Sequence, residues 1–156
     1  MRVLTEGIVD RTVVLFGFDA DPDPELTWAR GITLLAHDDA GDLPHPTQPV
    51  AVMGWSVAGL DALAFAARKP DLVDRIVLVA TPKPDDESLL PAVAGIRAKS
   101  LLLYGAKDPL TGHRHGTWWQ RQLPNARLEM YPDGSHDLLH PMWKRALSHL
   151  APRCKR

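Results

Sequence analysis

Short apolar runs, separated by polar segments rich in proline and glycine, dominate the pattern along this chain. Six of these runs are four to six residues long and end at a polar or turn-forming residue, which is typical of buried β-strands. They lie at Thr12–Phe16, Ile32–Ala36, Val50–Met53, Arg75–Ala80, Ser100–Tyr104 and Arg127–Tyr131. Because most of these runs are apolar along their length, we expect helices to cover both faces of the sheet.

Helical patterns separate several of the runs. An alanine-rich segment at Val57–Arg68 predicts a helix, as do Glu87–Ala94, Trp118–Leu123 and Met142–Leu150, whereas the proline-rich segment Gly41–Pro49 predicts a loop. Pro91 should disturb the second of these helices, because proline lacks the N–H that helical hydrogen bonds need. Strands that alternate with helices predict an α/β fold. We expect a three-layer sandwich, in which a mostly parallel sheet of about six strands has helices on both faces.

Length and charge narrow the class of protein. The chain has 156 residues, so we expect residues 1–156 to form a single domain. Its 18 Lys and Arg against 19 Asp and Glu give a net charge of −1, which argues against nucleic acid or anionic membrane as the main partner. No apolar run approaches the ~20 residues of a membrane span, and the first residues do not resemble a signal peptide. We therefore expect a cytoplasmic protein that binds neither nucleic acid nor membrane.

Three residues suited to nucleophilic catalysis each follow a predicted strand. They are Ser56, Asp108 and His136, in that order. In open parallel sheets, chemistry gathers at the carboxyl ends of the strands, so these side chains should lie at one edge. A serine hydroxyl becomes a strong nucleophile when a histidine takes its proton and a carboxylate holds that histidine in the right tautomer. The sequence therefore predicts a Ser-His-Asp site.

The segment around Ser56 passes from strand through turn to helix. Gly54 and Ala58, two positions before and after the serine, are small enough to permit a sharp turn that holds the hydroxyl above the sheet. The main-chain N–H of Val57, in the first turn of the helix, would then point at a developing oxyanion, and the helix dipole would add to the field.

On these residues the chain resembles the α/β-hydrolase superfamily. Gly54–Gly59, which has the pattern Gly-x-Ser-x-Ala-Gly, is similar to the family's nucleophile elbow, with Ala58 where Gly is usual. Leu101–Pro109 is similar to its acid-bearing loop, and Gly134–His136 to its histidine loop. The three segments occur in the family's order, and the resemblance implies a truncated α/β-hydrolase fold.

The resemblance also implies an activity. We expect a serine hydrolase that cleaves a small-molecule carboxylic ester or thioester through an acyl-enzyme intermediate, without a cofactor. By the match, Ser56 would be the nucleophile, His136 the general base and Asp108 the orienting acid. Trp55, next to the nucleophile, is expected to contact the substrate.

A further segment, Leu15–Phe18, is similar to the family's oxyanion loop, with Phe16 where histidine is usual. The match implies the main-chain N–H of Phe18 as a second oxyanion donor beside that of Val57. Because a main-chain group makes this contact, loop geometry matters more than side-chain identity.

Two features depart from the family pattern. The family's first two strands are expected to be missing or reduced to Arg2–Ile8, which leaves one sheet edge uncovered; a homodimer across that edge is one way to protect it. The 19 residues at 81–99, between two predicted strands, leave room for one helix and no lid domain. We therefore expect an open site.

Other interpretations stay open at this point. Asp108 could serve only as a turn residue, in which case Asp85 or Asp86 would supply the carboxylate. His140 also follows the last strand, although a cap or surface role suits it better. The whole chain could be a non-catalytic binding or scaffold protein that kept the fold, or a hydrolase of amide or C–C bonds, since the same triad serves all of these reactions.

A metal site is not expected. The pair His113 and His115 has no third ligand nearby in the sequence, and Cys154 is the single cysteine. Structural zinc needs four protein ligands and catalytic zinc three, so an exposed histidine pair is the better interpretation.

Overall fold

The computed structural model describes residues 1–38, 43 and 48–156, so most of the predicted loop Gly41–Pro49 lies outside the described residues. The strands in the described part are β1 (Arg2–Thr5), β2 (Thr12–Phe16), β3 (Thr33–Ala36), β4 (Val50–Trp55), β5 (Val73–Val79), β6 (Lys99–Gly105) and β7 (Ala126–Tyr131). The helices there are α1 (Pro24–Arg30), α2 (Ala58–Arg68), a 3-10 turn η1 (Glu87–Leu89), α3 (Leu90–Val93), α4 (Arg114–Gln122) and α5 (Leu139–Leu150).

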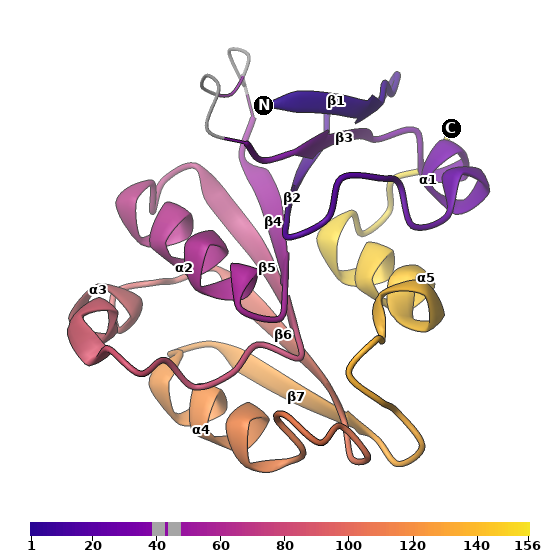
Figure 1. Cartoon of the computed structure of the whole chain (residues 1–156). Coiled ribbons are helices and arrows are strands. Elements are labelled where there is room, and N and C mark those ends of the chain that lie inside the picture. The colour runs from indigo at the N-terminus through magenta and orange to yellow at the C-terminus, as the bar shows by residue number, and fades with distance from the viewer. Residues whose placement is uncertain (39–42, 44–47) are drawn as a thin grey trace.

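The strands form one sheet between two layers of helices. Their order is β1-β3-β2-β4-β5-β6-β7, and every neighbouring pair is parallel except the antiparallel pair of β1 with β3. Helices α2, α3 and α4 lie on one face of the sheet, and α1 and α5 lie on the other (Figure 1). This arrangement confirms the predicted three-layer α/β sandwich.

Both faces of the central strands are buried, which explains their continuous apolar character. Val13 and Leu15 of β2 pack into the core on the side of α5, whereas Val14 and Phe16 pack on the side of α2. Side chains alternate between the faces of a strand, so every position of β2 after Thr12 must be apolar to fill two cores. The same alternation runs through β4, β5 and β6.

The prediction of six strands was one strand short. Arg2–Thr5, within the segment expected to be missing or reduced, forms β1 and pairs with the outer edge of β3. Its four residues are exposed or half-buried, and a short edge strand of this kind has a weak hydrophobic pattern. β1 therefore covers the edge of β3 and itself becomes an edge of the sheet, and the homodimer across that edge stays a prediction.

Helix α1 was not predicted, although its termini carry ordinary helix signals. The Asp23 carboxylate accepts a hydrogen bond from the N–H of Leu26, and Pro24 occupies the first turn, where its missing N–H is not needed. Gly31 ends the helix in the left-handed conformation at φ 71°. The Asp23-Pro24 pair, which is also common in loops, therefore begins a helix here.

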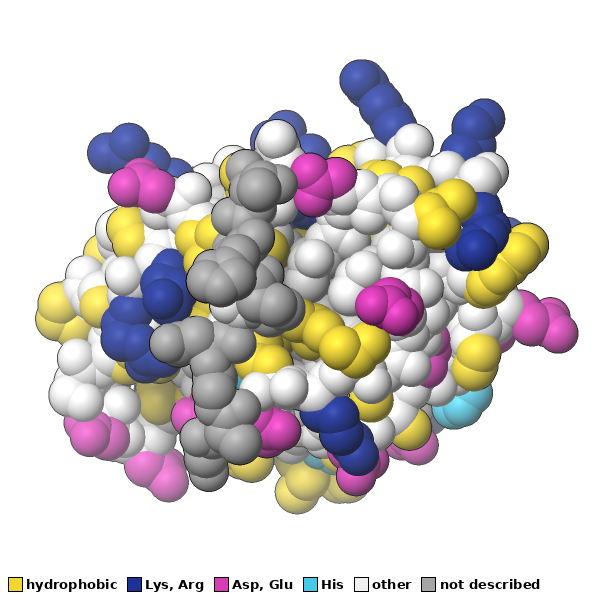
Figure 2. Space-filling model, turned by 90° about the horizontal axis from the view of Figure 1, so that it is seen from above, with side chains coloured by type: hydrophobic (Ala, Val, Ile, Leu, Met, Phe, Trp, Pro, Cys, Tyr) yellow, Lys and Arg dark blue, Asp and Glu magenta, His cyan; other side chains and the backbone are white. Residues whose placement is uncertain are grey.

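Charged side chains of both signs occur on the face seen from the β1 edge (Figure 2). In the part of the chain that the structure describes, no helix is long and apolar enough to cross a membrane.

The turn between β4 and α2 depends on a close approach of two glycines. A Cβ built on Gly54 would overlap the Cα of Gly59, and a Cβ on Gly59 would overlap the side chain of Thr81. Strand and helix can therefore approach this closely only without side chains at both positions. This contact holds the first turn of α2 against the sheet beside Ser56.

We expect Gly54→Ala to lower the free energy of unfolding by about 1–3 kcal/mol, because the new methyl group must push α2 away from β4. Denaturant unfolding followed by circular dichroism measures the change. Gly95→Ala is the matched control, since its Cβ would meet no atom closer than 3.5 Å. An equal loss in both variants would contradict the packing argument.

Candidate active site

Ser56 sits in a sharp turn between the end of β4 and the start of α2. Its backbone has a φ of 56°, which is uncommon for a residue with a side chain and marks a strained turn. The turn is held from both sides, because the Ser56 N–H donates to Val79 O at 2.7 Å and the Gly59 N–H donates to Ser56 O at 3.0 Å. The strained geometry therefore has specific support from β5 and from α2.

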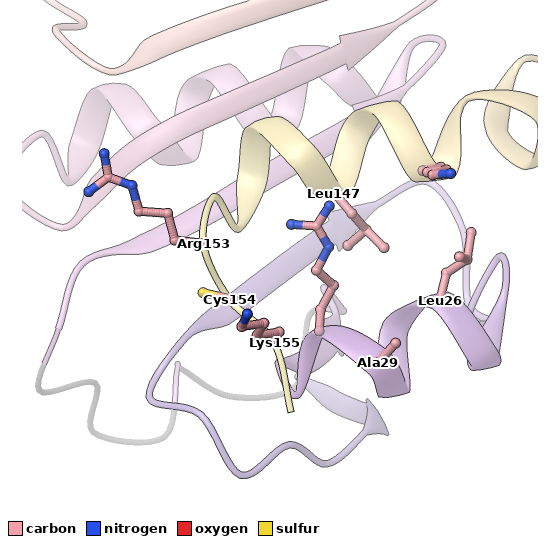
Figure 3. A pocket seen from close by; sticks show the side chains of 8 residues that line it. Leu26, Ala29, Leu147, Arg153, Cys154 and Lys155 are labelled. Carbon is pink, nitrogen blue, oxygen red and sulfur yellow. The ribbon is translucent and has the colours of Figure 1, made fainter.

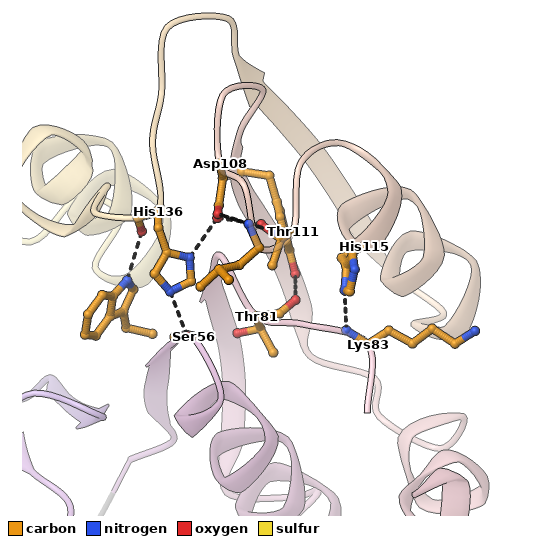
Figure 4. A network of polar contacts seen from close by, with 10 residues as sticks. Ser56, Thr81, Lys83, Asp108, Thr111, His115 and His136 are labelled. Atoms are coloured by element: carbon orange, nitrogen blue, oxygen red, sulfur yellow. Dashed lines mark hydrogen bonds and ion pairs between the residues drawn. The ribbon is translucent and has the colours of Figure 1, made fainter. Parts of the chain in front are cut away.

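A chain of hydrogen bonds links the three predicted polar residues (Figure 4). Ser56 Oγ lies 2.9 Å from Nε2 of His136, and Nδ1 of His136 lies 2.7 Å from Oδ2 of Asp108. The three side chains come from the turn after β4, the loop after β7 and the loop after β6. The parallel sheet thus brings together residues that are 80 and 28 positions apart in the sequence.

The Asp108 carboxylate is buried and fully surrounded by donors. Its side chain has 0% exposure, and it accepts hydrogen bonds from the Thr111 hydroxyl at 2.6 Å and the Leu110 N–H at 2.8 Å, besides the one from His136. Burial on its own would raise the pKa of Asp108, but the hydrogen bonds from Thr111, His136 and Leu110 outweigh it and leave the pKa below its ordinary value. Asp108 is therefore ionised at neutral pH.

An ionised carboxylate decides the tautomer of the histidine. Because a carboxylate only accepts hydrogen bonds, Nδ1 of His136 must carry a proton and donate it to Asp108. When the imidazole is neutral, Nε2 then has a free lone pair, which faces the hydroxyl of Ser56. The arrangement can accept a proton from the serine.

Asp108 combines the two roles that the sequence left as alternatives. One oxygen, Oδ1, accepts from the N–H of Leu110 and forms the turn, while Oδ2 accepts from His136 and from Thr111. The alternative acids have other positions. Asp85 is exposed, and Asp86 caps η1 by accepting from the N–H of Ser88 at 2.9 Å.

Thr111 is a part of the site that sequence reasoning missed. Its hydroxyl is buried and donates to the oxygen of Asp108 that also faces the histidine. An Asp followed three positions later by Thr is an ordinary turn pattern, in which the aspartate accepts hydrogen bonds from the turn. That turn pattern in the sequence could have indicated that Thr111 binds Asp108.

Trp55 contacts His136 through both its indole N–H and its ring. Its indole N–H donates to the main-chain oxygen of His136 at 3.1 Å, and the two rings lie 5.5 Å apart between centroids. The indole also packs against the apolar core on the side of α5. The predicted contact between Trp55 and substrate stays a prediction.

The predicted oxyanion donors flank the serine. A Cβ on Gly17, which has a φ of 97°, would overlap Ala58 at the start of α2, so the loop that ends at Phe18 lies directly against the Ser56 turn. Among the residues that the structure describes, neither the N–H of Phe18 nor that of Val57 donates a hydrogen bond. Their role as oxyanion donors stays a prediction.

The three other histidines considered above, His113, His115 and His140, form no hydrogen bond to Ser56, Asp108 or His136 in the described part of the structure. His115 accepts a hydrogen bond from the N–H of Lys83 at 2.7 Å, while His113 and His140 are exposed. Within residues 1–38, 43 and 48–156, no three His, Cys, Asp or Glu side chains are grouped as metal ligands.

A cavity of about 550 Å³ lies elsewhere, between α1, α5 and the residues after α5 (Figure 3). Its lining includes Leu26, Leu147 and Cys154, and none of Ser56, Asp108 or His136. Ser56 itself is half-buried at the carboxyl edge of the sheet. The three polar residues therefore lie at the carboxyl edge of the sheet and not in this cavity.

Comparison with known proteins identifies the fold. No family model matches the chain. Solved structures that superpose on it include a predicted CIB-like hydrolase of Thermoplasma acidophilum, with a TM-score of 0.70, 22% identity, and coverage of 87% of this chain and 83% of that one. Carboxylesterase CesB of Bacillus subtilis superposes with a TM-score of 0.70 at 14% identity, covering 93% of this chain and 85% of that one. An α/β-hydrolase enzyme from a lagoon-sediment metagenome superposes with a TM-score of 0.72 at 13% identity, covering 92% of this chain and 89% of that one. The chain has the α/β-hydrolase fold.

One curated protein is similar in sequence to part of this chain. It is the pimeloyl-(acyl-carrier protein) methyl ester esterase of Aromatoleum aromaticum, 42% identical over 78 residues. The match covers 50% of this chain and 28% of the esterase, so the chain spans less than a third of that protein's length in the comparison. The superposed structures confirm the predicted α/β-hydrolase fold class.

The lowered pKa of Asp108 predicts a pH dependence of stability. A carboxyl whose pKa is lower in the folded protein stabilises it above the ordinary pKa of Asp, about 4, and this contribution is lost as the pH falls through the folded value. We expect the wild type to be more stable than Asp108→Asn at pH 7 and the difference to shrink progressively below about pH 4. Urea unfolding at several pH values measures it, and a constant difference would contradict the assignment.

Proposed function

We propose that this chain hydrolyses carboxylic esters or thioesters of small molecules, with Ser56 as the nucleophile. One observation carries the proposal: an unbroken chain of hydrogen bonds runs from the Ser56 hydroxyl through the imidazole of His136 to the buried carboxylate of Asp108. Two kinds of comparison support it, the hydrolases and esterases that share the fold and the methyl ester esterase that shares part of the sequence.

The first half of the proposed reaction acylates the serine. Ser56 Oγ attacks the acyl carbon of the ester while Nε2 of His136 takes the hydroxyl proton. The carbonyl π electrons move onto oxygen, and a tetrahedral oxyanion forms. The imidazolium then gives its proton to the departing alkoxide or thiolate, so that an alcohol or thiol leaves and an acyl-serine remains. Throughout this half, Asp108 stabilises the positive charge on the imidazolium.

The second half releases the acid by the same groups. Water enters where the alcohol or thiol has left, and Nε2 of His136 takes one of its protons as the oxygen attacks the acyl carbon. Collapse of the second tetrahedral oxyanion breaks the bond to Ser56 Oγ, which regains a proton from the histidine. The proposed steps use a proton carrier, a nucleophile and water, and they need no cofactor.

The oxyanion of both halves would be held by the main-chain N–H groups of Phe18 and Val57. Three features support this proposal: both groups lack an acceptor among the described residues, both lie beside Ser56, and Val57 is at the first turn of α2. The positive end of the helix dipole adds to the stabilisation of a negative oxygen at this place.

The surroundings of the site favour an apolar group on the ester. Val57 directly follows Ser56 and Leu110 lies two positions after Asp108, and each is 66% exposed. Exposed aliphatic side chains beside polar reacting groups offer apolar surface to a substrate that lies across the edge of the sheet.

Removal of the nucleophile or the base should abolish turnover. We expect Ser56→Ala and His136→Ala each to lower kcat for a short p-nitrophenyl ester by about a thousandfold or more, because each removes a group that the transition state requires. Release of p-nitrophenol measures the rate. A fluorophosphonate probe should also label the wild type and not Ser56→Ala.

Ser88→Ala and His140→Ala serve as matched controls, since both residues are exposed and neither is hydrogen-bonded to the three polar residues in the described structure. Both controls should keep wild-type turnover. If the folded wild type neither turns over any ester of a substrate panel nor takes the probe, the chain is a non-catalytic binding or scaffold protein and the proposal is wrong.

The oxyanion contact predicts a distinctive effect at Phe18. Phe18→Pro removes the N–H and should lower kcat by about a hundredfold to a thousandfold, as the loss of one oxyanion donor does. Phe18→Ala keeps the N–H and should change kcat far less. Equal losses in the two variants, measured by steady-state kinetics on folded proteins, would show that the side chain and not the N–H is important.

A further inference from the structure

The loop that carries His136 has few main-chain hydrogen bonds of its own in the described structure. It begins after β7, and its first residues are held by hydrogen bonds from Lys107 N–H to Gly134 O and from Gly134 N–H to Tyr131 O, each 3.0 Å long. From position 135 to position 137, the main chain forms no hydrogen bond to any other main-chain group in the described part of the chain. Regular structure therefore does not hold the stretch that presents the histidine.

Trp55 provides the hydrogen bond to the main chain that this stretch otherwise lacks among the described residues. Its indole N–H donates to His136 O at 3.1 Å, which is the single hydrogen bond to the main chain of residues 135–137 among the described residues. Its ring also packs against the imidazole, at 5.5 Å between centroids and an angle of 46°. The indole of Trp55 thus contacts both the backbone and the ring of His136, while Asp108 and Ser56 bind the ring nitrogens.

The position of Trp55 in the chain makes this contact specific. It is the last residue of β4 and is bonded directly to Ser56. A closed ring of contacts results, because the peptide bond joins Trp55 to Ser56, the indole binds the backbone of His136, and the imidazole of His136 binds Ser56. The dipeptide Trp55-Ser56 therefore binds both the backbone and the imidazole of His136, and these two contacts together set the distance between the Ser56 hydroxyl and the imidazole.

We propose that Trp55 is a positioning residue, whose indole N–H anchors the His136 loop and so keeps the imidazole at proton-transfer distance from Ser56. The proposal rests on the proposed ester hydrolysis for its kinetic consequence. It gives Trp55 a role that acts through His136 and does not require contact with the substrate. Asp108 sets the tautomer of the histidine, and Trp55 sets the place of its backbone.

Two replacements of Trp55 separate the hydrogen bond from the shape of the side chain. Trp55→Phe keeps an aromatic ring and removes the N–H. Incorporation of 3-benzothienylalanine at position 55 keeps the two-ring shape and puts sulfur in place of the N–H, so it serves if the phenylalanine variant does not fold. Trp119→Phe is the matched control, because its indole N–H donates to Pro82 O at 3.2 Å and does not touch His136.

The first measurement needs no substrate. Heteronuclear NOE values of the amides of residues 135–137 report the order of the loop on the picosecond to nanosecond timescale. We expect these values to fall in both position-55 variants and to stay at the wild-type level in Trp119→Phe. If the loop keeps its order without the indole N–H, Trp55 does not anchor it and the proposal is wrong.

The second measurement uses steady-state kinetics on a p-nitrophenyl ester. Loss of one neutral hydrogen bond predicts a fall in kcat of about three- to tenfold with KM unchanged. In a His136→Ala background, Trp55→Phe should lower the residual rate no further, because there is no imidazole left to position. A raised KM with unchanged kcat would instead make Trp55 a substrate contact and overturn the proposal.

The two measurements can reject the proposed function and the anchoring role of Trp55 independently of each other. If the wild type hydrolyses no ester, the proposed function is wrong, and the NMR values still decide whether Trp55 orders the loop. If the wild type is active but the position-55 variants keep both wild-type kcat and an ordered loop, the proposed function stands and the anchoring role is rejected.

Discussion

The carboxylate of Asp108 is the group on which the rest of the site depends. It is buried, yet three donors keep it ionised, and one of its oxygens accepts from both Thr111 and His136. Because an ionised carboxylate can only accept, it fixes the proton of the imidazole on Nδ1 and leaves Nε2 for Ser56. A neutral acid at this place would remove that preference. The proton transfer available to Ser56 is thus determined by Asp108, a buried residue 28 positions before the histidine.

The sheet explains how such distant residues meet. The parallel strands β4, β6 and β7 all end at the same edge of the sheet. At that edge, glycines allow neighbouring backbones to lie in direct contact. Gly54 and Gly59 let α2 approach β4, while a Cβ on Gly105 would overlap the carbonyl of Gly134 between the acid and histidine loops. The favourable packing of the two cores therefore offsets the conformational cost of the strained backbone at Ser56.

The sequence predicted the sheet well because its central strands fill two cores and must be apolar throughout. It predicted the three polar residues from their order and their places after strands. It missed elements whose signals were short or ambiguous: β1 has a half-exposed edge pattern, and the Asp23-Pro24 start of α1 resembles a loop. It also treated the turn and acid roles of Asp108 as alternatives. Only coordinates show that its two oxygens serve one role each, and that the indole of Trp55 bonds to a backbone 81 residues away.

The most direct test of this account is the protonation of the two ring nitrogens of His136. Nitrogen-15 NMR of selectively labelled histidine distinguishes a protonated ring nitrogen from one with a free lone pair, at a pH where the imidazole is neutral. The account predicts that Nδ1 of His136 carries the proton and Nε2 does not, and that Asp108→Asn abolishes this preference. A proton on Nε2 of the wild-type protein would contradict the claim that Asp108 prepares the histidine to accept from Ser56.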